Sequence, residues 1–378
     1  MGVCNRCKGK GHYAQFCPKG RVYLHEFFDA QGFRDARRDL AALEPTNEKE
    51  QARKQWVSSF LDKIDKAYDV PDANGLRWLR VSYLQRCDST GKPAGRHQAT
   101  GVATGPAYAD GKNSDVILQG MMRELRGYAV GPSARSCPAY RRREHGHAHD
   151  LDFKICQPMI FSQLPTLLTW VDGRAPPSVK EILALCSDRD GLFKELAAHH
   201  KLAPDSEQYD GYQKDLLKKL TTSLFFGGSY WGWIKREKLS SIPPHPKVEA
   251  LEKEIGMLRK AVFESEQWAP FVAEWRAVLQ TEKEGDANAI DRSVMARIAQ
   301  HIEDQCLMAM KAQLEKDGWT VLALVFDGAI VRHLDGQAFD VGRLQARVLA
   351  ETKLHMKVEE KPLYDAEPKL VLKRDFGV

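Results

Sequence analysis

Four metal-binding side chains fall within a short segment near the start of the chain. Cys4, Cys7, His12 and Cys17 are separated by two, four and four residues, which gives the pattern C-x2-C-x4-H-x4-C. Three thiolates and one imidazole complete the tetrahedral shell of a structural zinc ion, and so few residues could not fold without the metal. We therefore expect one zinc ion, bound by these four residues.

The side chains between and beside these ligands suit contact with single-stranded nucleic acid. Tyr13 and Phe16 would offer ring faces on which unpaired bases stack, while Lys8 and Lys10 would contact phosphates. The segment resembles the zinc knuckles of retroviral nucleocapsids and many RNA-binding proteins. The C-x-x-C-x-G-x-G unit of heat-shock co-chaperones is an alternative for its first part. That unit normally recurs in tandem, whereas it occurs once here.

The net charge of the chain is concentrated in the same segment. Residues 1–22 hold five lysines and arginines and no acid, which leaves 51 of the 56 basic residues to balance the 51 acidic ones. The whole formal charge of +5 therefore lies on this segment. A basic stretch without acids suits phosphate contact, although without the cysteines it would indicate only a solvated tail.

Carboxylates at the edges of apolar strands form a second group of candidate functional residues. Asp150 and Asp152 are two residues apart, so a strand points both side chains to one face. Asp327 lies at the turn of an apolar hairpin over 322–331. Bound Mg²⁺ would compensate such acids, and carboxylates of neighbouring strands that hold two magnesium ions suit phosphoryl transfer. Alternatively, Asp327 is simply part of a hairpin turn and Asp150 an acid flanking a helix.

The order of several short motifs favours the first interpretation. The motifs are Gly95-Arg96, Leu118-Gln119 followed by Arg126, Asp150-Leu151-Asp152, the stretch from Lys218 to Tyr230, and Phe326-Asp327-Gly328. In this order, the chain from Tyr83 to about Pro362 resembles the polymerase core of family A DNA polymerases. It is more similar still to the divergent polymerase-like proteins of large DNA viruses and mobile elements. The resemblance implies a palm with an antiparallel sheet, helical fingers, and nucleoside triphosphates and a primer–template duplex as ligands.

The same resemblance implies roles for individual residues. Asp152 and Asp327 match the two catalytic aspartates that hold two Mg²⁺ ions, and Asp150 is the alternative to Asp152. The residues matched to nucleotide binding are Lys218, Lys219, Phe226 and Tyr230. The residues matched to contact with the primer–template are Arg96, Gln119 and Arg126.

Two positions depart from the family pattern. Thr222 stands where the family has a lysine that contacts the incoming nucleotide, and Gly328 stands where it has a glutamate. These departures support an alternative function, a non-enzymatic protein that binds single strands through the knuckle and retains an inactive polymerase-like scaffold.

A run of alternating histidines adjoins Asp150. His145, His147 and His149 would share one face of a strand, where three imidazoles can bind a transition metal. Such a run is more often an exposed polar loop, which is the interpretation we prefer.

Composition indicates a soluble globular protein, with 43% apolar and 28% charged residues. No apolar run approaches the roughly 18 residues of a membrane helix, and the first residues lack the pattern of a signal peptide. We therefore expect an intracellular protein without a membrane partner.

Hydrophobic periodicity predicts the elements that position these residues. Helices are expected over 24–44 and 47–68, the second with Asn47 and Glu50 in capping-box positions and an apolar face that starts at Trp56. A strand is expected over 77–85, a long loop over 88–113 and a helix over 115–126.

The rest of the chain is expected to be mainly helical with a few strands. The expected helical segments are 158–225, 247–263 with a continuation to 280, 291–316 and 338–352. The expected strands are 150–156, 320–326, 329–332 and 355–361. Long helices with few strands indicate an α+β fold. We expect a zinc knuckle at 1–21, a helical thumb-like region at 22–75, and a polymerase-like palm with fingers at 76–378.

Overall fold

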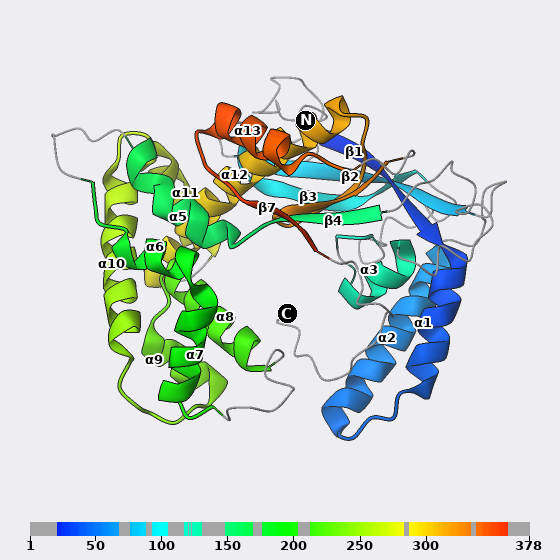
Figure 1. The fold of residues 1–378 in the computed structure, drawn as a ribbon, viewed down its shortest axis with the longest axis horizontal. Helices are drawn as coiled ribbons and strands as arrows, with labels where there is room; N and C mark the ends of the chain where they lie inside the picture. The colour runs from blue at the N-terminus through cyan, green and yellow to red at the C-terminus, as the bar shows by residue number, and fades with distance from the viewer. Residues whose placement is uncertain are drawn as a thin grey trace.

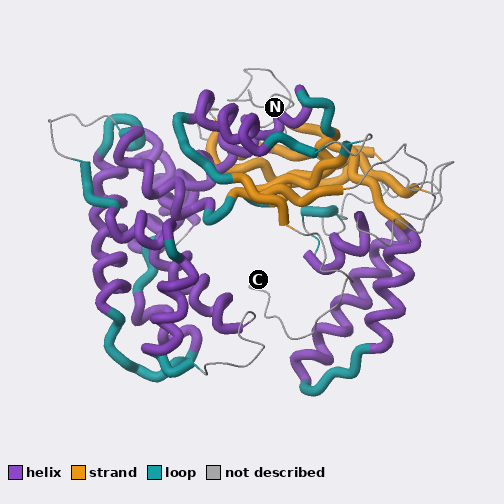
Figure 2. The backbone as a smooth tube through the Cα atoms, viewed as in Figure 1, coloured by secondary structure: helices purple, strands orange, loops and turns teal. Residues whose placement is uncertain are grey.

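The computed structural model describes residues 21–67, 76–87, 93–104, 117–119, 121, 123–130, 148–168, 176–202, 212–282, 287–333 and 338–361. Antiparallel sheets occupy its middle, and a group of helices projects from each end toward the same side (Figure 1, Figure 2). The zinc-ligand segment, with Tyr13, Phe16, Lys8 and Lys10, lies outside the described residues. In the described part, no helix is both long enough and apolar enough to cross a membrane.

The predicted catalytic aspartates belong to a sheet with the strand order β5-β6-β4-β7, in which all neighbours are antiparallel. Its strands are β4 (Ala148–Phe153), β5 (Thr320–Val325), β6 (Gly328–Arg332) and β7 (Val358–Lys361). β4 therefore lies between β6 and β7. The strands predicted in these four places are confirmed, with shifted ends.

A second sheet has the order β1-β2-β3. Its strands are β1 (Arg21–Asp29), β2 (Leu76–Cys87) and β3 (Pro93–Thr104). The prediction for β2 is confirmed, but the predictions of a helix from residue 24 and of a loop throughout 88–113 are wrong. Pairing on both sides of β2 decides the conformation of these flanking segments. As a consequence, the helical thumb-like region expected at 22–75 begins with a strand.

A helical hairpin follows β1. It consists of α1 (Ala30–Ala42) and α2 (Glu48–Ala67). Asn47 caps α2, because its Oδ1 accepts a hydrogen bond of 2.9 Å from the backbone N–H of Glu50. The Glu50 carboxylate accepts from the N–H and the hydroxyl of Thr46, one residue earlier than in a standard capping box. Val57 and Ile64 are buried, but Trp56 is 52% exposed, so the apolar face is narrower than predicted.

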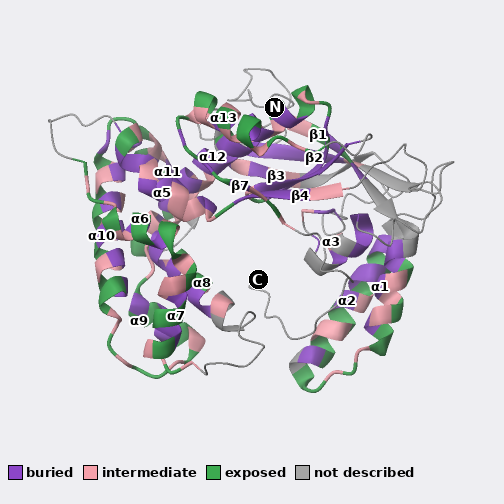
Figure 3. Ribbon diagram, viewed as in Figure 1, coloured by how far each residue is buried: buried purple, intermediate pink, exposed green. Residues whose placement is uncertain are grey.

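The other helical group contains helices in the ranges predicted at 158–225 and 247–280, and one over 230–237 that was not predicted. They are α5 (Cys156–Leu167), α6 (Lys180–Ser187), α7 (Arg189–His199), α8 (Tyr212–Phe225), α9 (Tyr230–Glu237), α10 (Pro246–Glu264) and α11 (Ala269–Glu282). Buried and exposed residues alternate along these helices, as expected for helices with one side packed against neighbours (Figure 3). The helix predicted over 115–126 is wrong, since 117–119 form a turn and α3 (Arg123–Val130) starts later.

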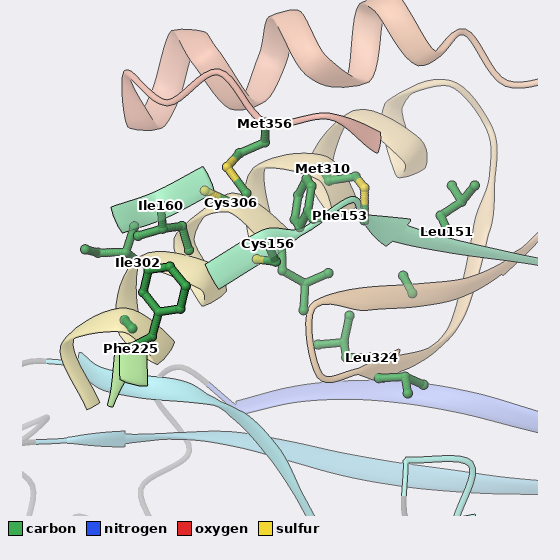
Figure 4. Close-up of a cluster of buried hydrophobic side chains, with 14 of the residues drawn as sticks. Leu151, Phe153, Cys156, Ile160, Phe225, Ile302, Cys306, Met310, Leu324 and Met356 are labelled. Carbon is green, nitrogen blue, oxygen red and sulfur yellow. The ribbon is translucent and has the colours of Figure 1, made fainter. Parts of the chain in front are cut away.

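The long helix α12 (Ala287–Lys316) connects the sheets with the helical group. It contacts β3, β5 and β6 as well as α5, α11 and α13 (Val341–Thr352). Phe153, Cys156, Cys306 and Met310 form part of a buried apolar cluster in which β4, α5 and α12 meet (Figure 4). Burial of one large apolar side chain stabilises a fold by about 1.5–3 kcal/mol. This cluster therefore fixes the end of β4 that carries Asp152.

Candidate active site

Charged side chains gather on one face of β4 and β7. Asp150 and Asp152 share this face as predicted, and both are buried, at 7% and 8% exposure. In the register of the two strands, Lys361 is opposite Asp150 and Glu359 is opposite Asp152. Because directly opposed residues lie on the same side of a sheet, all four side chains belong to one face. We call these four residues the acidic face.

The two carboxylate oxygens of Asp152 differ in their surroundings. Oδ2 forms an ion pair with Nζ of Lys361. Oδ1 is buried without a hydrogen-bond partner. A buried polar atom without a partner costs about 1–3 kcal/mol, and more when it is charged. Asp152 therefore has one oxygen available to a ligand.

The turn between β5 and β6 brings Asp327 to the same end of the sheet. The backbone N–H of Phe153 donates a 3.3 Å hydrogen bond to the carbonyl of Asp327, which ties the turn to the end of β4. Burial raises the pKa of Asp327 to about 6, and the negative charges of Asp150 and Glu359 add to this increase. Its own backbone hydrogen bond and the Arg96 guanidinium oppose the rise in pKa. Asp327 is therefore electrostatically part of the acidic face.

Gly328 allows β6 to approach β4 closely. A Cβ at this position would lie 2.4 Å from the carbonyl oxygen of Leu151 and 3.1 Å from Oδ1 of Asp152. No side chain fits at the first distance without movement of the strands. The departure from the family pattern at Gly328 therefore has a local steric reason.

The residue before Asp327 has an unusual backbone. Phe326 has a φ of 55°, in the left-handed region that non-glycine residues seldom adopt. Its ring is 47% exposed, and the Arg96 guanidinium lies 4.8 Å from the ring centroid. Arg96 thus contacts the hairpin turn itself.

Two buried acids on α12, Glu303 and Asp304, were not predicted from the sequence as residues near the site. Oε1 of Glu303 lies 3.4 Å from the Arg96 guanidinium, and its other oxygen accepts a hydrogen bond from the amide of Gln157. Burial raises the pKa of Glu303 to about 8, the charge of Asp327 adds to the rise, and Arg96 opposes it.

Asp304 connects the same helix to the other sheet. Its carboxylate accepts from the backbone N–H of His97 at 2.5 Å and from the Gln85 amide at 2.8 Å, and it lies 2.8 Å from Nδ1 of His97. Glu303 and Asp304 are adjacent acids on the otherwise apolar side of the helix predicted over 291–316. Two adjacent acids on an apolar side of a helix are the sequence signal by which these residues could have been found.

The residues predicted to contact the primer–template lie in three different places. Gln119 links the sheets, because its Oε1 accepts from the N–H of Ala99 at 2.7 Å and its Nε2 donates to the carbonyl of Leu324 at 3.0 Å. Arg96 lies beside Asp327, and Arg126 is half-buried on α3. Of these three residues, the structure therefore brings Arg96 to the acidic face.

The residues predicted to bind the nucleotide lie in the helical group. Lys218 is exposed on α8, whereas Nζ of Lys219 lies 3.7 Å from a carboxylate oxygen of Glu237. Phe226 is half-buried, and its ring centroid is 6.4 Å from that of Phe161. Tyr230 is only 1% exposed, and its hydroxyl donates a 3.0 Å hydrogen bond to the carbonyl of Ile242. Tyr230 therefore packs the helical core and offers no ring face to a base.

The histidine run reaches the described residues only at its end. Nδ1 of His149 lies 2.6 Å from Oε1 of Glu360, on the side of β4 away from Asp150. His145 and His147 lie outside the described residues.

Few carboxylates of the site are placed so that they could bind one metal ion together. Within the described part of the chain, no three His, Cys, Asp or Glu side chains converge on one point where they could hold a metal ion. Mg²⁺, however, is commonly held by one or two carboxylates, with waters and substrate phosphates completing its shell. The buried Oδ1 of Asp152, which has no hydrogen-bond partner, fits such a role.

Comparison with known proteins finds similarity among solved structures. No protein-family model and no curated protein matches the chain. The chain is similar to the POL domain of Pol1 from M. smegmatis in complex with DNA primer-template and dNTP, with a TM-score of 0.47 and 12% sequence identity. The similarity covers 81% of this chain and 50% of the other, so this chain spans about half of that domain's length.

Proposed function

We propose that the chain is a template-directed nucleotidyltransferase of the DNA-polymerase type, with Asp152 and Asp327 as its catalytic carboxylates. The observation that supports this function is the concentration of buried and half-buried acids where β4 meets the β5–β6 turn. Asp152 keeps a buried oxygen without a hydrogen-bond partner, and Asp150 and Glu359 both raise the pKa of Asp327. Such an excess of negative charge suits divalent cations.

The side chains of the site would have different roles in metal binding, nucleotide binding and primer–template binding. Asp152 and Asp327 would hold two Mg²⁺ ions, with Asp150 as the alternative ligand. Bound there, the ions would lower the pKa of a primer 3′-hydroxyl and neutralise charge on the triphosphate and the leaving pyrophosphate. Lys218 and Lys219 would contact the triphosphate, Phe226 would lie near the new base pair, and Arg96, Gln119 and Arg126 would orient the primer–template.

The N-terminal segment would add a second contact with nucleic acid. Its donor set of Cys4, Cys7, His12 and Cys17 fits one zinc ion. The aromatic and basic side chains beside these ligands would hold single-stranded RNA or DNA.

Primer extension with Mg²⁺, four nucleotides and a primed single-stranded template tests the enzymatic function. Asp152→Asn and Asp327→Asn keep side-chain size and remove the charge, so each should lower the extension rate by about two orders of magnitude or more. Glu315→Gln, an exposed acid on α12, is the matched control and should extend normally. Extension that persists in both aspartate variants would place the catalytic carboxylates elsewhere.

The alternative function is a non-enzymatic nucleic-acid-binding protein with an inactive polymerase-like scaffold. Two observations favour it: Lys361 already pairs with Asp152, and an exposed Thr222 replaces the family's lysine on α8. The absence of extension, together with zinc-dependent retention of a single-stranded oligonucleotide, would support this alternative.

A further inference from the structure

The acidic face includes one basic residue of the sheet itself. Lys361 stands opposite Asp150 at the end of β7, but its Nζ reaches along the strand to Oδ2 of Asp152. The side chain of Lys361 is 35% exposed, whereas that of Asp152 is 12% exposed. In this ion pair, a partly exposed lysine side chain therefore contacts a largely buried carboxylate.

The neighbouring charges explain why Asp152 needs this partner. Asp150 and Glu359 lie on the same face, and the turn that carries Asp327 is hydrogen-bonded to Phe153 at the same end of β4. Arg96, a cation near the turn, contacts Glu303 at 3.4 Å. Among the ion pairs of the described residues, Lys361 directly contacts the predicted metal ligand of β4.

We propose that Lys361 is an internal counterion that occupies Asp152 until a divalent cation displaces it, and that it thereby sets the metal concentration at which the site fills. This inference rests on the proposed function, because it takes Asp152 as a metal ligand. A lysine ammonium and Mg²⁺ both seek carboxylate oxygens, and their like charges disfavour simultaneous contact with the same group.

The structure offers Lys361 a way to leave. β7 is held to β4 by its strand pairing, so the backbone can stay in place while the flexible four-carbon side chain turns to water. The Lys361 side chain is partly exposed, whereas Oδ1 of Asp152 is buried without a hydrogen-bond partner. Displacement therefore requires a side-chain rotation and no movement of the sheet.

Metal titration of the full chain, with its zinc retained and without nucleic acid, tests the inference. Mn²⁺ is the probe, and the free ion is followed by its electron paramagnetic resonance signal. Lys361→Met keeps most of the length of the unbranched side chain and removes its charge, so it should tighten Mn²⁺ binding by about tenfold or more. Lys357→Met, an exposed lysine just before β7, is the matched control and should bind as the wild type does.

A double variant links the effect to the proposed contact. In Asp152→Asn, the carboxylate that both cations would share is gone, so the further change Lys361→Met should give no tightening. Thermal unfolding provides a second readout. Without added Mg²⁺ or Mn²⁺, Lys361→Met should be less stable than the wild type, because buried acids lose their counterion, and it should regain stability in Mg²⁺.

The possible outcomes separate the inference from the proposed function. Equal or weaker Mn²⁺ binding by folded Lys361→Met, with wild-type binding that still depends on Asp152, would overturn the role of Lys361 alone. Wild-type protein without any Asp152-dependent binding would overturn the metal site and the inference with it. Lys361→Gln gives the same test if the methionine variant does not fold.

Discussion

Single buried acids dominate the chemistry of this molecule, including one outside the candidate site. Glu26 on β1 is completely buried, and its carboxylate accepts hydrogen bonds of 2.7 Å from the Tyr83 hydroxyl and from the backbone N–H of Leu118. Burial raises the pKa of Glu26 to about 7, although both hydrogen bonds act in the opposite direction. The folded state therefore holds a proton on Glu26 more tightly than the unfolded chain does.

This raised pKa predicts a pH dependence of stability. The contribution of Glu26 is fully present below pH about 4.5 and is lost as the pH rises through about 7. The loss amounts to about 3 kcal/mol in the free energy of unfolding. Urea unfolding at pH 5 and pH 8 should show that Glu26→Gln reduces the difference between the two values. The exposed Glu266→Gln should leave the difference unchanged, and an equal change in both variants would contradict this assignment.

Gly328 gives a second prediction for a single residue. Gly328→Ala should lower the free energy of unfolding by about 1–3 kcal/mol, because the new methyl group meets the Leu151 carbonyl. It should also disturb Asp152 and weaken metal binding. Gly256→Ala on α10 is the control, since its Cβ would enter open space and should stabilise the helix by up to about 1 kcal/mol. Equal stabilities of the two variants would show that β4 and β6 can separate without loss.

At the scale of elements, Asp304 attaches the β2–β3 pair to α12. Asp304→Ala should lower the free energy of unfolding by about 3 kcal/mol, since buried donors on His97 and Gln85 lose their acceptor. Gln305→Ala, whose side chain is exposed on the same helix, should change stability by less than about 0.5 kcal/mol. Chemical denaturation measures both values. A small effect of Asp304→Ala would mean that apolar contacts alone hold β3 on α12.

Elements with strong local signals could be predicted from the sequence, and the others could not. α2 has a cap and a regular apolar face, and the β5–β6 hairpin is an apolar run interrupted by one short turn. β3 consists largely of glycine, alanine, threonine and polar residues, so only its pairing with β2 and its contact with Asp304 make it a strand. β1 carries Glu26 toward the core, and that acid is satisfied by a partner that is distant in sequence.

The candidate site could likewise be predicted only in part. Asp150, Asp152 and Asp327 could be found because acids in apolar strands are conspicuous. Lys361 and Glu359 could not be found, since their relation to Asp150 and Asp152 depends on the register of β4 with β7. Tyr230 matched a motif, but the surrounding helices enclose its ring.

At the scale of the whole molecule, zinc and the sheet are expected to act separately. The four predicted zinc ligands lie within residues 4–17, so we expect the metal to organise this short segment and not the elements between Arg21 and Lys361. Removal of zinc with a chelator should therefore weaken binding of a single-stranded oligonucleotide and leave the thermal unfolding of these elements unchanged. Fluorescence anisotropy and circular dichroism measure the two effects. A parallel loss of core stability would show that the metal also supports the fold.

The position of β4 in its sheet has a consequence for synthesis on the ribosome. β4 ends at Phe153, but its partners β6 and β7 begin only at Gly328 and Val358. At a synthesis rate of about 5–20 residues per second, both edges of β4 stay unpaired for on the order of ten seconds. A strand with open edges can pair with other chains during that interval. We therefore expect the yield of soluble protein to depend on chaperones that shield the nascent chain until its last strands emerge.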